Sequence, residues 1–259
     1  MRIVRRVVPP LGVLVLVVAA WFVASNLLLK PDRRFLLPSP DAVVRVSYLD
    51  RYHLADLLRA LALSAQVALA GLAIAFVVGV ASAVLMSQAR WLERSLYPYA
   101  VLLQTVPILA LIPLFGYWFG FGYVSRVLVV VLFALFPVIA NTLFGLRSVD
   151  RGHHDLFTLY GAGRLTRLWK LQLPTAVPSI FTGLRVSAGA AVIGAVVGDF
   201  FFKQGQPGIG QLIQNYSQGT TPELLFGSVL LSSLFGLVVF LVFAGVARRV
   251  ASWHESNES

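Results

Sequence analysis

The sequence predicts an all-α polytopic membrane protein with six transmembrane helices. Its 259 residues are 58% hydrophobic and only 12% charged, and the mean hydropathy is +0.81. A soluble domain of this length is rarely so apolar. In addition, the apolar residues fall into six runs, each long enough to cross a bilayer as a helix. We therefore expect one transmembrane domain over residues 1–259.

The first span is expected at about 11–29, a run without a charged residue that follows Arg2, Arg5 and Arg6. The run is longer than the apolar core of a secretory signal peptide, which is about 7–15 residues, and no clear cleavage site follows it. We therefore interpret it as a membrane span rather than a removed leader. The polar stretch 30–60 comes next and contains three prolines, which block a continuous helix.

The second span is expected at about 63–86. Just before it, residues 53–63 alternate leucine with polar residues at helical spacing, which predicts an amphipathic helix lying at the membrane interface. Inside the span, small residues recur at intervals of three or four and predict close packing against another helix. These small residues are Ser64, Ala68, Gly71, Ala75, Gly79 and Ala83.

The third and fourth spans, about 99–119 and 127–146, carry polar residues that are candidates for a solute pathway. The third span holds Gln104 and Thr105 close to two prolines, and an interrupted polar segment in a membrane helix often lines a cavity. Threonine can also bond to its own helix, and proline is tolerated in spans, so both interpretations stay open. In the fourth span Asn141 is a candidate as well, although buried amides usually bond to a neighbouring helix.

The fifth span, about 179–201, carries a second stripe of small residues, which predicts packing against protein rather than lipid. Asp199 lies near its far end. We favour solvation of Asp199 or pairing with Lys203 over contact with a transported solute, which stays open as a pathway role. The sixth span is expected at about 224–247. The small residues of the fifth span are Gly183, Ser187, Ala191, Gly194 and Gly198.

The distribution of Lys and Arg predicts which side of the membrane each loop faces. Six spans put both termini on one side, and the segments on that side hold twelve of these residues, against eight on the opposite side. Cytoplasmic loops carry the excess of positive charge in membrane proteins. We therefore expect both termini, and the loop 147–178, in the cytoplasm.

The loop 147–178 is the long polar interval of an otherwise apolar chain, and it predicts two short helices joined by a turn. Ser148 is a plausible cap for a first helix that runs to Tyr160. Gly161 and Gly163 then permit the backbone to turn sharply. A second short helix is expected to follow directly.

This second helix is expected to be amphipathic and to end at Pro174, with Pro178 in the first turn of the fifth span. Such a helix can lie on lipid, or it can dock in a groove of a partner protein. The glycine turn and the proline junction favour docking, because displacement of the loop would then be transmitted into the fifth span. The apolar face holds Leu165, Leu168, Trp169 and Gln172, and Arg164, Arg167 and Lys170 lie away from it.

Several function classes lack the residues that they need. The chain has no cysteine, which excludes thiol catalysis and Cys-based metal sites. It contains no phosphate-binding glycine loop with Lys-Ser/Thr, no His-Glu-x-x-His and no Gly-x-Ser-x-Gly, so we expect no catalytic residue. His153, His154 and Asp155 do not predict a metal site, because adjacent histidines point apart on a helix. The net charge of +10 is scattered between apolar runs, which argues against a nucleic-acid partner.

Several motifs occur in the order typical of ABC importer permeases. They are LLPSPDAV after the first span, the turn SQARWLERSLYPY, the segment QTVPILALIPLFGYWFGFG, and FPVIANTLFGLRSVD before the polar loop. The loop itself resembles the EAA loop of that family, with Asp155 in place of the usual glutamate and with Leu156 and Phe157 in place of two alanines. The resemblance covers nearly the whole chain and is nearest to the branch that imports sulfonates, taurine, nitrate or thiamine-precursor pyrimidines.

This resemblance implies a type I importer permease fold in the bacterial cytoplasmic membrane, in contact with lipid. It implies a homodimer of permeases around a central pathway, two ATPase subunits that bind ATP and Mg, and an extracytoplasmic binding protein; this chain would bind no cofactor itself. It also implies that the region around Gly161 enters a groove on the ATPase. The coupling residues would be Asp155, Gly161, Ala162, Gly163, Arg164, Arg167, Leu173, Pro174 and Pro178.

A stand-alone channel or secondary transporter is the alternative function. Such proteins often need charged residues inside the membrane for ion coupling, and many show internal repeats. Here the spans are nearly free of charge, with Asp199 and Arg185 only near span ends, and no clear repeat is present. This argues against ion coupling, whereas a passive pore stays open.

Overall fold

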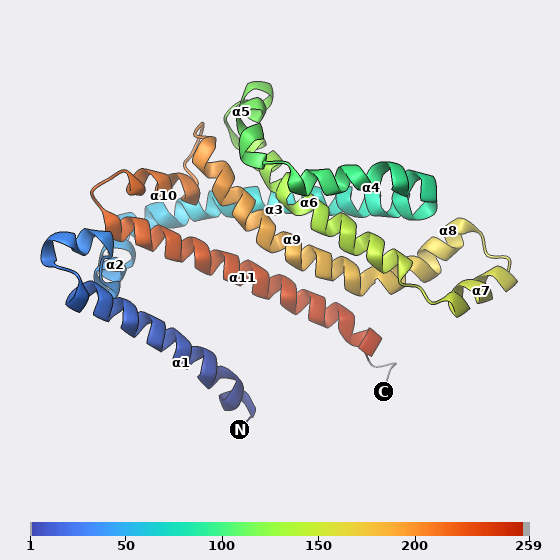
Figure 1. Cartoon of the computed structure of the whole chain (residues 1–259), viewed down its shortest axis with the longest axis horizontal. Helices are drawn as coiled ribbons and strands as arrows, with labels where there is room; N and C mark the ends of the chain where they lie inside the picture. The colour runs from blue at the N-terminus through green and yellow to red at the C-terminus, as the bar shows by residue number, and fades with distance from the viewer. Residues whose placement is uncertain (1, 256–259) are drawn as a thin grey trace.

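The computed structural model describes residues 2–255, and over this range the fold is helical and contains no strand (Figure 1). In chain order the elements are α1 (Arg2–Val23), η1 (Ala24–Leu28), η2 (Pro31–Leu36), α2 (Pro40–Val44), η3 (Arg45–Leu49), α3 (Arg51–Gln88), α4 (Arg90–Thr105), α5 (Ile108–Phe119), α6 (Tyr123–Arg147), α7 (Arg151–Leu159), α8 (Arg164–Arg167), η4 (Leu168–Gln172), α9 (Leu173–Phe201), α10 (Ile209–Ser217) and α11 (Pro222–Glu255).

Long helices connect two ends of the molecule (Figure 1). α2 and α10 lie at one end, which we call the α10 end. α7 and α8 lie at the other, which we call the α7 end. Between them run α3, α6, α9 and α11.

Among the described residues, five helical stretches are long and apolar enough to cross a bilayer, and a sixth results if the bent pair α4–α5 counts as one span. The five belong to α1, α3, α6, the stretch Arg164–Phe201 and α11. The predicted class, an all-α polytopic membrane protein, is confirmed.

The core of the bundle is formed by α3, α6 and α9, which pack closely because small residues line their contacts. A Cβ added to Gly183 on α9 would lie 2.8 Å from Cβ of Asn141 and 2.9 Å from the carbonyl oxygen of Pro137 on α6. A Cβ added to Gly79 on α3 would lie 2.7 Å from Cγ1 of Val138. The close packing predicted from the small residues of the second and fifth spans is therefore confirmed.

α1 and α11 are less enclosed than the core helices. In the apolar window of each, 6% of the residues are buried, against 39% in α3 and 44% in α6. α1 is held near its C-terminal end, where the ring of Trp21 stacks on Phe226 at 5.9 Å and its indole N–H donates to the carbonyl of Pro38 at 3.0 Å. Most of the apolar surface of these two helices therefore faces outward.

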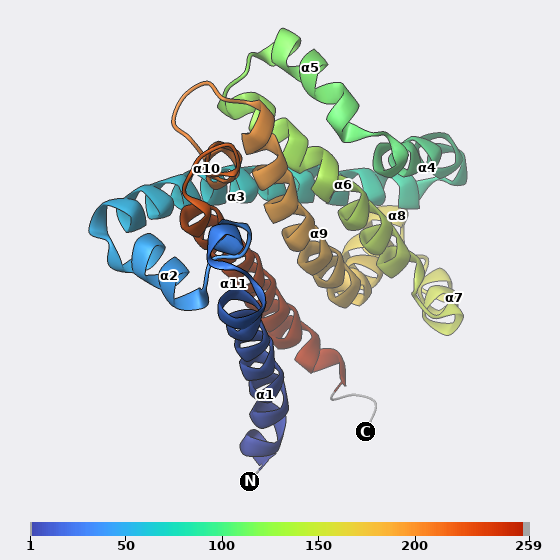
Figure 2. The same cartoon turned by 60° about the vertical axis from the view of Figure 1, so that its left-hand side comes forward.

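The expected third span, about 99–119, is not one straight helix. α4 and α5 meet at an angle of 99° (Figure 2). Pro107 causes the break, because it has no N–H to donate and because it disfavours helical dihedrals at the preceding residue. Val106 accordingly adopts φ −65° and ψ 129°, which is extended.

The expected interfacial helix at 53–63 is also different in the structure. Asp50 caps the N-terminus of α3 by accepting hydrogen bonds from the backbone N–H groups of Tyr52 and His53. From there one helix of 38 residues continues to Gln88. Its length of about 57 Å exceeds the roughly 30 Å hydrocarbon core, so the segment 53–63 is the extension of a span rather than a separate surface helix.

Candidate functional site

The elbow between α7 and α8 is a rigid turn rather than a flexible connection. Gly161 has φ +62°, in the left-handed region that favours glycine. The N–H of Gly161 donates to the carbonyl of Thr158, and the N–H of Ala162 donates to the carbonyl of Phe157, both at 3.0 Å. This pair of hydrogen bonds is a Schellman motif, which satisfies the last carbonyls of α7 and fixes the direction in which the chain leaves it.

The far side of the elbow is held by Arg167. Its Nε donates to the carbonyl of Ala162 at 3.0 Å, and its backbone N–H donates to the carbonyl of Gly163, the N-cap of α8, at 3.0 Å. One arginine therefore ties the first turn of α8 back to the glycine turn. The sharp turn predicted from Gly161 and Gly163 is confirmed.

The cap of α7 was predicted wrongly. Asp150, not Ser148, precedes the helix, and its carboxylate accepts a hydrogen bond from the N–H of Gly152. The Ser148 hydroxyl instead donates to the carbonyl of Gly145 at 2.8 Å and so closes the end of α6. Serine and aspartate both cap helices well, so the sequence alone did not separate the two positions.

The predicted stop at Pro174 is also wrong. Helix runs without a break from Arg164 to Phe201, through α8, η4 and α9, so Pro178 lies inside a helix. η4 is a wide π turn in which the N–H of Leu173 donates to the carbonyl of Leu168, five residues back. A proline ring ordinarily clashes with the carbonyl four residues earlier, and a widened turn gives it room. The elbow is therefore joined to the core by continuous helix.

The apolar residues of the elbow divide into an inner and an outer group. Leu168 and Leu171 are buried, and Leu168 packs in a cluster with residues of α3, α6 and α9. The outer group is exposed, with exposed fractions of 86% for Leu159, 82% for Tyr160 and 68% for Trp169. We call Leu156, Leu159, Tyr160, Leu165 and Trp169 the elbow surface.

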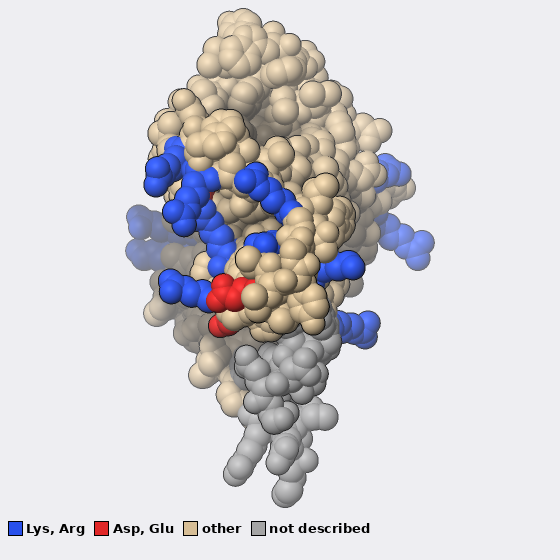
Figure 3. Space-filling model, turned by 90° about the vertical axis from the view of Figure 1, so that its right-hand side faces the viewer, with Lys and Arg blue, Asp and Glu red and all other residues tan. Residues whose placement is uncertain are grey.

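Exposed cations lie in the same segment as the elbow surface. Arg164 and Lys170 are exposed, and so is Asp155 on α7. Figure 3 shows the end of the molecule that carries α7 and α8, where blue Lys and Arg side chains outnumber the red acidic ones. An exposed apolar patch with a charged border is typical of a protein interface, because water contact with such a patch is unfavourable until a partner covers it.

The candidate pathway residues lie in different places and differ in exposure. Gln104 and Thr105 lie together at the bend between α4 and α5 with exposed side chains, and the Thr105 hydroxyl donates to the carbonyl of Leu102 at 3.0 Å. Asn141 is half-buried at the contact of α6 with α9, and its amide nitrogen donates to the carbonyl of Pro137 at 2.8 Å.

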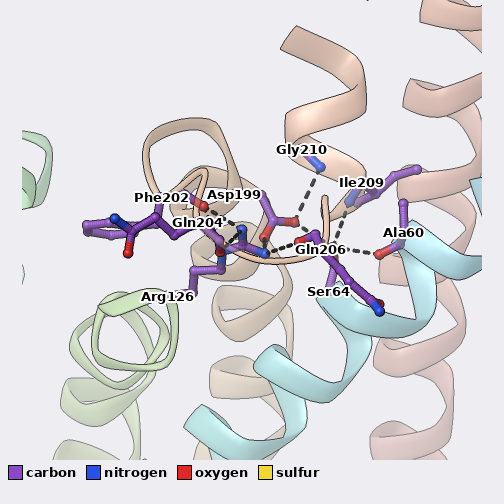
Figure 4. A network of polar contacts seen from close by, with 9 residues as sticks. All are labelled: Ala60, Ser64, Arg126, Asp199, Phe202, Gln204, Gln206, Ile209 and Gly210. Atoms are coloured by element: carbon purple, nitrogen blue, oxygen red, sulfur yellow. Dashed lines mark hydrogen bonds and ion pairs between the residues drawn. The ribbon is translucent and has the colours of Figure 1, made fainter. Parts of the chain in front are cut away.

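Asp199 forms a buried ion pair that sequence reasoning missed. The partner is Arg126 rather than Lys203: an Arg126 nitrogen lies 3.3 Å from a carboxylate oxygen of Asp199, and the exposed fractions are 1% and 0% (Figure 4). The same guanidinium donates to the backbone carbonyls of Phe202, Gln204 and Gln206, three points of the turn after α9. Arg126 thus holds that turn against the start of α6.

The carboxylate of Asp199 also caps α10. It accepts hydrogen bonds from the Ser64 hydroxyl and from the N–H of Gly210, while the Ser64 oxygen accepts from the N–H of Ile209 at 2.8 Å (Figure 4). Both N–H groups belong to the first turn of α10. N–H groups in the first turn of a helix have no carbonyl acceptor within that helix. Gly208 is required beside them, because a Cβ there would collide with the Asp199 carboxylate. One network therefore joins α3, α6, α9 and α10.

A signal for this network was present in the sequence. Arg126 and Asp199 are opposite charges at the ends of two otherwise apolar runs, and such residues tend to pair. Arg126 is one of the eight Lys and Arg residues expected on the side opposite the termini, and the structure shows it buried and paired rather than in an exposed loop.

The fold and the elbow together define a class: a membrane protein with a helical core and an exposed elbow that is continuous with one of its spans. Residues 40–252 match the family of binding-protein-dependent transport system inner membrane components. The chain therefore belongs to this family, and the resemblance to ABC importer permeases is confirmed. It is a permease component of a system that imports a small solute across the membrane, and it spans that membrane several times.

Three relatives illustrate the family. The formylaminopyrimidine transport permease protein ThiX of Halalkalibacterium halodurans is 32% identical over 251 residues, 96% of each chain. The putative aliphatic sulfonates transport permease protein SsuC of Escherichia coli is 32% identical over 234 residues, 89% of this chain and 86% of the relative. The taurine transport system permease protein TauC of Escherichia coli is 26% identical over 255 residues, 96% and 91% of the two chains.

Proposed function

We propose that this permease carries a small polar solute of the kind its relatives are named for, a sulfonate, taurine or a pyrimidine, and that an extracytoplasmic binding protein delivers it. Nitrate belongs to the same group, since a nitrate import permease of Leptolyngbya laminosa is 30% identical over 184 residues. The solute class rests on the names of these relatives. The observation that supports an ATP-driven mechanism is the elbow surface, which is exposed, apolar and joined to α9 by continuous helix.

We infer that two ATPase subunits contact the permease pair and that each receives one elbow surface in a groove. Leu159, Tyr160 and Trp169 then provide the apolar contact, and Arg164 and Lys170 lie at its border. ATP and Mg bind to the ATPase, and hydrolysis takes place there. A movement of the ATPase displaces the elbow, and the continuous helix from Arg164 to Phe201 carries that displacement into the membrane.

We infer the orientation from charge. The α7 end faces the cytoplasm, as do both termini, because the terminal segments and the loops expected on that side hold twelve Lys and Arg residues against eight on the other side. Arg126 is buried in an ion pair, so it is left out of the count of Lys and Arg in the loops opposite the termini. The excess of positive charge on the side of the termini is then larger.

A second copy of the permease is proposed to complete the pathway. The exposed apolar faces of α1 and α11 leave room for a copy and for lipid. Gln104 and Thr105 are the favoured pathway residues, since their side chains are exposed at a break in a membrane helix. A cysteine at either position, in a chain that has none, should react with a water-soluble maleimide in at least one state of the transport cycle, and protection in every state would contradict a pathway role.

Reconstitution tests the proposed function. Purified permease in vesicles should take up solute only when the ATPase, ATP and the binding protein are all present. Uptake by the permease alone would support the alternative function, a passive channel, and would overturn the proposal.

A further inference from the structure

A cavity of about 780 Å³ opens at the α7 end, where α3 ends and α4 begins. Most of its lining is charged or polar, and it is separate from the elbow surface. The residues that matter here are Ser87, Arg90, Glu93, Arg94, Tyr97 and Arg147.

The cavity is built by one face of α4 opposite the end of α6. Arg90, Glu93, Arg94 and Tyr97 are spaced at i, i+3, i+4 and i+7, so their side chains lie on the same side of the helix. Arg147, in the last turn of α6, closes the other side. The three arginines therefore come from two helices and converge on one space.

Positive charge exceeds negative charge in the cavity, which is lined by three arginines and one glutamate. Glu93, with an exposed fraction of 18%, pairs with Arg147 and is thereby occupied. Within residues 2–255 no ion pair involves Arg90 or Arg94, so two guanidinium groups face the cavity without an ion-pair partner. Guanidinium groups present their N–H donors in a planar fork that matches a phosphate oxygen pair.

We propose that this cavity binds a phosphate group, and that the group belongs to the headgroup of an anionic phospholipid. The lipid source follows from position, because α4 leads directly into the bent span. Trp91 and Tyr99 lie on the same helix with exposed fractions of 69% and 67%, and these side chains concentrate at the membrane–water boundary. Basic pockets between membrane helices on the cytoplasmic side hold anionic headgroups, and this step rests on the orientation proposed above.

The proposal does not depend on which solute is carried or on how the ATPase docks. Its residues come from α3, α4 and α6, whereas the elbow surface lies on α7, the turn that follows it, α8 and η4. Failure of one proposal therefore leaves the other standing.

The test uses the purified full chain in nanodiscs of phosphatidylcholine, with or without phosphatidylglycerol, followed by native mass spectrometry of retained lipid. The variant Arg90→Gln/Arg94→Gln should lower the preference for phosphatidylglycerol about 30-fold, as expected for two arginines near an anionic headgroup. The matched control Arg33→Gln/Arg51→Gln removes the same charge from exposed positions outside the cavity and should leave the preference unchanged.

A further variant and further binding measurements distinguish the possible explanations of the result. Arg94→Lys keeps the charge and should retain most of the phosphatidylglycerol preference. An unchanged thermal unfolding midpoint of the Arg90→Gln/Arg94→Gln chain checks that its loss of lipid preference is not a folding defect. If inorganic phosphate binds the chain but phosphatidylglycerol is retained no better than phosphatidylcholine, the lipid source is wrong. If the double variant keeps its preference for phosphatidylglycerol, the two arginines do not bind the headgroup and the proposal is overturned.

Discussion

At the scale of single residues, Gly161 determines the geometry of the elbow. Its φ of +62° is unfavourable for residues with a Cβ, yet no atom lies within 4 Å of where that Cβ would be. The constraint at this position is therefore the backbone conformation and not space. Substitutions at position 161 therefore test the left-handed backbone conformation without introducing a steric clash.

We predict that Gly161→Val weakens ATPase association and that Gly161→Asn largely preserves it. The β-branched side chain raises the cost of the left-handed conformation by about 1–2 kcal/mol, whereas asparagine adopts it more readily. Pull-down of the ATPase from detergent-solubilised membranes measures the difference. Equal recovery with Val and Asn would show that the turn does not matter for docking.

The second residue-scale prediction concerns Arg126 and Asp199. Removing one member of a buried ion pair leaves an unpaired buried charge, which costs about 3–5 kcal/mol. Arg126→Met and Asp199→Leu should each lower the thermal stability of the purified chain, and the double variant should lose less than the two single losses combined. Strict additivity would mean that the two side chains do not interact as the structure has them.

At the scale of elements, the contact of α6 with α9 connects the elbow to the rest of the bundle. Small residues on α9 face α6 where the two helices meet, while other small residues on the same helix face open space. Gly183 and Gly189 represent the two cases: a Cβ at Gly183 would meet Asn141 and Pro137, and a Cβ at Gly189 would meet nothing within 4 Å.

We predict that Gly183→Val destabilises the protein and that Gly189→Val does not. Overpacking of this kind costs about 1–3 kcal/mol, because the two helices must separate to admit the side chain. Thermal unfolding of the detergent-purified chains measures both variants under the same conditions. A greater loss for Gly189→Val than for Gly183→Val would contradict the packing described for α9.

At the scale of the whole molecule, local patterns were enough to predict the class and the close packing of two of the expected spans. Apolar runs and small-residue stripes are local signals, and the sequence displays them directly. What could not be predicted depends on distant contacts: Arg126 and Asp199 are 73 positions apart, and the choice between Lys203 and Arg126 requires the fold.

The candidate site was predictable to a different degree in each part. The glycine turn was found from Gly161 and Gly163, because a left-handed residue after a helix is a sequence signal. The continuous helix across Pro174 was not predicted, because a proline usually ends a helix. The π turn before Pro174 explains why the helix continues there. The angle of 99° between α4 and α5 was not predicted either, because proline is also tolerated inside membrane helices without a break of this size.

The central claim is that the elbow surface contacts the ATPase, and two tyrosines of nearly equal exposure test it. Tyr160 on the elbow is 82% exposed, and Tyr52 near the start of α3 is 84% exposed. A photo-crosslinking amino acid placed at each position, in cells that make the complete transporter, reports which end of the molecule the ATPase reaches. We predict a crosslink to the ATPase from position 160 and none from position 52; a crosslink from position 52 alone would contradict the claim.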